Sequence, residues 1–226
     1  MVESWVHPFF EGLAFVIAWF VRRHMKIESS WQTMPWRYVY GIFVALGSCF
    51  GAFVLGSANA LLSFHGVIGQ SILGAIIGGI IGAELFKWRY GIEGSTGGSF
   101  VPSLVLGIAV GRLGCFFDGM EDFTYGTPTS YPWGVDSGDG ILRHPVALYE
   151  SLAMGLFFWY SWVIFYRNRV QFDTTIFYQF AFFYGFQRFL WEFLKPYERV
   201  AGLSVFQWGS LVLIVYGWYS WRRSRG

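Results

Sequence analysis

The sequence predicts an all-α integral membrane protein, and three observations indicate this class. Hydrophobic residues make up 54% of the 226 residues, whereas charged residues make up only 13%, about half of the share found in soluble domains. The mean hydropathy is +0.43. Several apolar runs approach the roughly 20 residues that a helix needs to cross a bilayer core. We therefore expect residues 1–226 to form a single polytopic membrane domain.

Seven apolar runs follow one another along the chain, and we interpret each as a transmembrane helix. Pro8 interrupts the first run and leaves its start open. Glycines recur at small-xxx-small spacing in the third run, as is typical of helices that pack closely in lipid. The seven runs are Trp5–Val21, Tyr38–Gly56, His65–Phe86, Phe100–Phe117, Pro145–Tyr166, Thr175–Leu194 and Leu203–Trp221.

The basic residues between the runs predict the orientation. Eleven of the sixteen Lys and Arg residues fall on one side of a seven-helix topology: Arg22, Arg23, Lys26, Arg37, Lys87, Arg89, Arg167, Arg169, Arg222, Arg223 and Arg225. The positive-inside rule then places the N-terminus outside and the C-terminus in the cytoplasm. The net charge is only +2 and no basic stripe is present, so a nucleic-acid partner is not expected.

The longest polar stretch lies between the fourth and fifth runs, at about 118–144, and the orientation makes it an outward-facing loop. A connection of this length is more often functional than a plain link. Asp136 and Asp139 in this loop are a weak signal for calcium, and a turn explains them better. Cys49 and Cys115 lie in apolar runs without CxxC spacing, so neither a disulfide framework nor a metal site is predicted.

Polar residues gather at the outer ends of the runs, where a buried charge is costly and indicates a functional site. Each has a structural alternative when taken alone. His65 suits an interfacial hydrogen bond, Arg112 suits snorkelling, and Glu150 suits an ion pair with Arg112 or Arg143. The residues concerned are His65, Arg112, Arg143, His144, Tyr149, Glu150, Arg188 and Glu192.

Taken together, these residues suit an anionic lipid head group. Arginine binds phosphate through a planar, bidentate fork, and histidine moves protons near neutral pH. Two arginines and a histidine on one side of the membrane therefore predict a site that holds a phospholipid head group and assists a displacement there.

The same segments resemble the prolipoprotein diacylglyceryl transferase family. The matching motifs occur in family order: SFHG at Ser63–Gly66, GRLG at Gly111–Gly114, RHPVALYE at Arg143–Glu150 and YGFQRFLWEF at Tyr184–Phe193. The resemblance implies a bacterial inner-membrane enzyme with its active site towards the outer leaflet. Such an enzyme moves a diacylglyceryl group from phosphatidylglycerol to the cysteine thiol of an exported lipoprotein precursor, and no cofactor is expected.

The resemblance also implies the roles of residues. His65, Arg112 and Arg188 would be catalytic, with both arginines on the phosphoryl leaving group. The base would be His65 or a water held by an arginine. A substrate-binding role would fall to Arg143, His144, Tyr149, Glu150 and Glu192, together with Cys115 and Asp118.

Cys115 and Asp118 are departures from the family pattern, because asparagines are usual at both positions. The Cys115 thiol beside Arg112 suits either a nucleophile or a small buried apolar residue, and the second interpretation is favoured. Full activity of Cys115→Ser and Cys115→Asn would exclude the nucleophile. The departures also favour two alternatives: a different acceptor, or a non-catalytic phospholipid-binding or assembly protein that kept the transferase scaffold.

Overall fold

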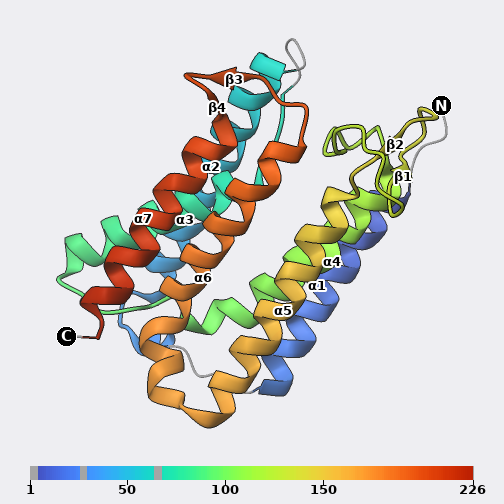
Figure 1. Ribbon diagram of the computed structural model, residues 1–226. Helices are drawn as coiled ribbons and strands as arrows, with labels where there is room; N and C mark the ends of the chain where they lie inside the picture. The colour runs from blue at the N-terminus through green and yellow to red at the C-terminus, as the bar shows by residue number, and fades with distance from the viewer. Residues whose placement is uncertain (1–4, 26–29, 64–67, 226) are drawn as a thin grey trace. The chain divides into compact units, whose positions relative to one another are not determined.

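The computed structural model describes residues 5–25, 30–63 and 68–225 (Figure 1). Within these residues the chain forms seven α-helices, three 3-10 turns and two short hairpins. The helices are α1 (Val6–Met25), α2 (Arg37–Ser63), α3 (Ile72–Tyr90), α4 (Val101–Asp118), α5 (Val146–Arg167), α6 (Arg169–Trp191) and α7 (Val205–Arg223). The turns are η1 (Ser30–Thr33), η2 (Gly98–Phe100) and η3 (Glu192–Leu194), and the strands are β1 (Val135–Asp136), β2 (Leu142–Arg143), β3 (Arg199–Val200) and β4 (Leu203–Ser204).

The predicted all-α membrane class is confirmed, and each predicted apolar run overlaps one helix. Among the described residues, three segments are long and apolar enough to cross a membrane: Arg37–Ser63, Gly98–Asp118 and Val146–Arg167. Helix α6 is less apolar because it carries Gln, Thr and Arg side chains. The seven crossings and the orientation stay predictions. The third run was expected from His65, but α3 begins at Ile72, and His65 lies outside the described residues.

The chain forms two compact units, each built from separate segments. The first unit contains Met1–Ile27, Phe100–Phe172 and Leu190–Pro196. The second contains Glu28–Ser99, Asp173–Phe189 and Tyr197–Gly226. The expectation of one domain over the whole chain stays a prediction.

In the first unit, α4 packs against both α1 and α5, and the three helices run side by side in Figure 1. Serine hydroxyls link them. Ser103 Oγ donates to the carbonyl of Ala18 in α1 at 2.9 Å, and Ser151 Oγ of α5 donates to the carbonyl of Ala109 at 2.8 Å. Interhelical hydrogen bonds of this kind help to hold helices together where water is absent.

The loop between α4 and α5 is ordered by the antiparallel pair β1 and β2, in which Val135 faces Arg143. Asp136 shapes the turn between them. Its Oδ1 accepts the backbone N–H groups of Gly138, Asp139 and Gly140 at 2.8, 3.1 and 3.0 Å. Gly138 and Gly140 have φ of 116° and 77°, which glycine adopts readily. The turn interpretation of this acidic segment is confirmed.

In the second unit, α2 and α3 approach each other at the level of their backbones. A Cβ atom on Gly51 would meet the carbonyl oxygen of Gly74, and one on Gly78 would meet that of Gly47. The small-xxx-small interpretation is therefore confirmed for α3. Such contacts replace side-chain packing with close van der Waals contact between backbones.

Polar contacts fix the ends of α3 and α7 in the same unit. Ser71 caps the first turn of α3 by accepting from Gly74 N, and Ser204 with Gln207 forms a capping box at the start of α7. Between the two helices, the Tyr216 hydroxyl donates to Glu84 at 2.8 Å. Each cap satisfies backbone donors that would otherwise be unpaired.

The close approach of α2 and α3 predicts different outcomes for two Gly→Ala substitutions. Gly78→Ala would force a methyl group against the Gly47 carbonyl, and overpacking costs about 1–3 kcal/mol. Gly107→Ala, in α4, meets nothing within 4 Å and is expected to be neutral or stabilising by about 0.5–1 kcal/mol. Thermal unfolding in detergent measures both, and equal losses would contradict the close-contact explanation.

Candidate functional site

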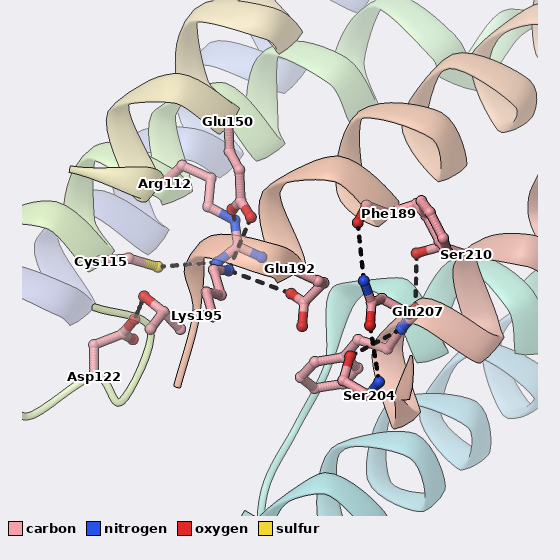
Figure 2. A network of polar contacts seen from close by, with 12 residues as sticks. Arg112, Cys115, Asp122, Glu150, Phe189, Glu192, Lys195, Ser204, Gln207 and Ser210 are labelled. Carbon is pink, nitrogen blue, oxygen red and sulfur yellow. Dashed lines mark hydrogen bonds and ion pairs between the residues drawn. The ribbon is translucent and has the colours of Figure 1, made fainter. Parts of the chain in front are cut away.

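The first unit contains a buried group of four charged residues, which we call the charge cluster: Arg112, Glu150, Glu192 and Lys195. They are 9%, 1%, 2% and 3% exposed, respectively. Figure 2 shows Arg112 and Glu150 pointing towards each other, with Lys195 reaching the carboxylates of Glu150 and Glu192. The cluster has two positive and two negative groups, so it is neutral as a whole.

Glu150 is the central member because its two oxygens face different cations. Oε2 lies 2.7 Å from Arg112 Nε, and Oε1 accepts a hydrogen bond from Lys195 Nζ at 2.9 Å. Lys195 Nζ is also 3.6 Å from Glu192 Oε1. A charge removed from water is tolerated only when it is paired in good geometry, and here each carboxylate has a cation. The proposal that Glu150 anchors an arginine is confirmed, and that arginine is Arg112.

Three separate parts of the chain bring these four residues together. Arg112 lies in the second half of α4, and Glu150 lies just over one turn into α5. Glu192 opens η3, and the Lys195 N–H donates to the Glu192 carbonyl at 3.2 Å. The backbone of this segment is also tied to the loop, because Thr127 N donates to the Leu194 carbonyl at 2.7 Å.

Lys195 is the member that sequence reasoning missed. Its position just after the sixth apolar run gave no sign that its side chain is buried. The useful signal was the spacing of three residues between Glu192 and Lys195, which brings side chains together across one helical turn. That signal is weak, since the same spacing is common on exposed helices.

Cys115 lies beside the cluster, with its Sγ 3.8 Å from Arg112 Nη1. It also lines a small cavity together with Tyr125, Ser137 and His144. The structure thus brings Cys115 and His144, both predicted site residues, to one cavity. Asp118 is the last residue of α4 and is partly exposed.

His144 and Tyr149 belong to an aromatic group at the loop. The Tyr149 hydroxyl lies 3.5 Å from His144 Nδ1 and accepts a hydrogen bond from Trp133 Nε1 at 2.9 Å. The ring of Tyr149 is 5.2 Å from that of Trp191. These contacts fix the orientation of the Tyr149 ring and hold the loop above the start of α5.

Arg143 holds the loop together. Its Nη2 and Nε donate to Asp139 Oδ2 at 2.6 and 3.0 Å, and its Nη1 donates to the Gly126 carbonyl at 3.1 Å. Its guanidinium also lies 5.1 Å from the centre of the Tyr125 ring. The hydrogen bond from Arg143 lowers the pKa of Asp139 below its usual range, and the same contact raises the pKa of Arg143.

Arg188 belongs to the second unit. It is 3% exposed, and its guanidinium lies 5.2 Å from the centre of the Phe206 ring of α7. A cation above an aromatic face is favourable, and more so away from water. The catalytic roles predicted for Arg112, Arg188 and His65 stay predictions.

The fold and the charge cluster define an all-α membrane protein with a buried, charge-paired arginine in one of its apolar helices. The chain belongs to the prolipoprotein diacylglyceryl transferase family, whose sequence model matches residues 9–222.

Similar proteins carry the name phosphatidylglycerol–prolipoprotein diacylglyceryl transferase. The one from Bordetella parapertussis is 34% identical over 163 residues, covering 66% of this chain and 59% of that protein. The one from Aliarcobacter butzleri is 32% identical over 173 residues, covering 71% and 60%. The one from Finegoldia magna is 38% identical over 119 residues, covering 52% and 46%. The matched part thus spans about three fifths or less of the length of these relatives.

The charge cluster predicts a large effect of Lys195→Met. The change keeps an unbranched side chain of nearly the same length but leaves two buried carboxylates with one cation fewer, which costs about 3–5 kcal/mol of stability. Lys195→Arg keeps the positive charge and is expected to lose less stability than Lys195→Met. Thermal unfolding of the purified protein in detergent measures the difference.

Lys87→Met is the matched control. Lys87 also pairs with a Glu three residues earlier, but the Glu84 side chain is 43% exposed, so the expected loss is within about 1 kcal/mol. Similar losses of thermal stability in Lys195→Met and Lys87→Met would show that the burial of the charge cluster does not add to the effect of losing the lysine.

The contact between Arg143 and Asp139 predicts that the pKa of Asp139 depends on Arg143. Arg143→Gln removes the positive donor and should raise the pKa of the Asp139 carboxyl towards its usual value. The pKa of Asp139 is lower in the folded than in the unfolded protein. The pair therefore stabilises the loop at a pH above the ordinary pKa of a carboxyl group, and this stabilisation is lost as the pH falls through the lowered pKa. Carboxyl NMR titration measures it, with Asp139→Asn for assignment. An unchanged titration of Asp139 in Arg143→Gln would contradict this contact.

Proposed function

We propose that this protein transfers a diacylglyceryl group from phosphatidylglycerol to a cysteine thiol of a lipoprotein precursor. The observation that carries the proposal is the buried pair of Arg112 and Glu150, with Arg112 held through Nε at 2.7 Å. An arginine fixed in this way can meet a phosphate without reorganising. The names of the similar proteins supply both substrates.

The reaction is a displacement at carbon. The thiol sulfur forms a bond to the terminal glycerol carbon of the diacylglyceryl group, and the bond from that carbon to the phosphate oxygen breaks. The electron pair leaves with the phosphate, which departs as glycerol phosphate, and the thiol proton passes to a base. The products are a thioether and a phosphate monoester, so atoms and charge balance without a cofactor.

Two arginines are proposed to act on the phosphate, namely Arg112 and Arg188. Negative charge grows on the phosphate as the bond to carbon breaks, and fixed donors in a site without water stabilise such charge strongly. His65 or a water held by an arginine is proposed to take the thiol proton. Glu150 is proposed to position Arg112, which it contacts, and Lys195 and Glu192 to hold Glu150 in place through the charge cluster. Arg143, His144, Tyr149, Cys115 and Asp118 are proposed to frame the substrates.

The proposed location is the bacterial inner membrane, with seven crossings, the N-terminus outside and the site towards the outer leaflet. The distribution of Lys and Arg supports this orientation, since basic residues favour the cytoplasmic side. A lipoprotein precursor that has been exported presents its cysteine on that same outer side.

The proposal predicts that Arg112→Gln and Arg188→Gln each lower transfer by about 10²–10³-fold, the usual effect of removing one donor to a developing charge. Mass spectrometry of a lipobox peptide incubated with phosphatidylglycerol and the purified variants measures thioether formation. Arg89→Gln, at an exposed position of α3, should keep full activity.

The alternative is a phospholipid-binding or assembly protein without chemistry, favoured by Cys115 and Asp118 in place of the usual asparagines. A stable wild-type protein that binds phosphatidylglycerol but forms no thioether, and fails to rescue cells depleted of their own transferase, would support this alternative and overturn the proposal.

A further inference from the structure

Three glutamines of the second unit have buried side chains, and two of them are satisfied by the protein. Gln179 Nε2 donates to Thr175 Oγ1 at 3.0 Å. Gln207 Oε1 accepts from Ser204 N at 2.9 Å, and its Nε2 donates to the Phe189 carbonyl at 3.4 Å. These two amides have clear structural tasks, one within α6 and one at the start of α7.

Gln187 is the third, and it differs from the other two. It is 5% exposed, and among the residues that the structure describes neither its Oε1 nor its Nε2 has a hydrogen-bond partner. A buried amide without partners is strongly unfavourable, so each such group in a folded protein calls for an explanation. An apolar side chain of the same length would pack there at lower cost.

The position of Gln187 indicates what the amide binds. It directly precedes Arg188 in α6, so the two side chains leave the helix about 1.5 Å apart along its axis and about 100° apart around it. Gln187 is therefore offset from the phosphate on Arg188, towards a part of the same head group further from the phosphorus. Arg188 is the proposed phosphate ligand. A neutral carboxamide adds no charge for the phosphate, but it offers both donors and acceptors. Hydroxyl groups, which also donate and accept, are the matching partners.

We propose that Gln187 binds the terminal glycerol hydroxyls of the phospholipid head group and makes the protein select a hydroxyl-bearing head group. This inference rests on the proposed function, because that function supplies the phosphate beside Arg188. A site built to bond a substrate hydroxyl discriminates well against a ligand that lacks it. Gln187 is thus a specificity-determining residue for the donor lipid.

The main test compares Gln187→Met with Gln179→Met in the purified full chain. Gln187→Met should raise the KM for phosphatidylglycerol about tenfold, the effect of losing roughly one hydrogen bond, while its thermal stability stays equal or rises. Gln179→Met removes a satisfied amide from the same helix, so it should lose stability and leave the KM unchanged. An unchanged KM in Gln187→Met would overturn the proposal.

A second measurement needs no variant. Phosphatidylglycerol should bind the wild-type protein at least tenfold more tightly than phosphatidic acid, whose phosphate carries no head-group glycerol. The lipid concentration that raises the melting temperature measures the binding. Equal binding of the two lipids would overturn the proposal even if Gln187→Met failed to fold.

The two readouts also separate this inference from the proposed function. A protein that never forms a thioether, yet prefers phosphatidylglycerol through Gln187, would refute the transferase and retain the hydroxyl contact. If Gln187→Met forms the thioether with the KM of the wild type, the transferase is retained and the hydroxyl contact is refuted.

Discussion

Charge neutralisation in an apolar environment is the constraint on which the first unit depends. Glu150 is almost fully buried and meets a cation on each of its oxygens, one from α4 and one from the segment after η3. A single pair would satisfy one oxygen only. The shared carboxylate therefore fixes three parts of the chain at once, and the chemistry proposed for Arg112 depends on a residue about 80 positions away in the sequence.

The helices of the two units pack against one another through different kinds of contact. In the second unit, α2 and α3 remove side chains from their interface and bring glycine backbones into contact. In the first unit, α1, α4 and α5 keep side chains and add serine hydrogen bonds to carbonyls of neighbouring helices. Lipid tails are as apolar as leucine, so neither unit gains from burying apolar surface alone. Both rely on contacts that lipid cannot make.

The sequence predicted the helices well because the length of an apolar run reflects the thickness of the bilayer directly. It predicted less of the site because pairing is a property of three-dimensional neighbours. Glu150 had two plausible partners, Arg112 and Arg143, and only the structure separates them: Arg143 contacts Asp139 instead. Lys195 resembled an ordinary loop lysine, and Gln187 looked the same as Gln179 until the partners of each amide were known.

The loop between α4 and α5 has contacts that are mostly short in sequence. Asp136 bonds residues two to four positions ahead, and Arg143 bonds Asp139 and Gly126. A segment organised by local contacts folds quickly, and the bond from Thr127 N to the Leu194 carbonyl then ties it to a distant part of the chain. In the orientation that we propose, this loop has to cross the membrane during biogenesis, and its local contacts can form again afterwards.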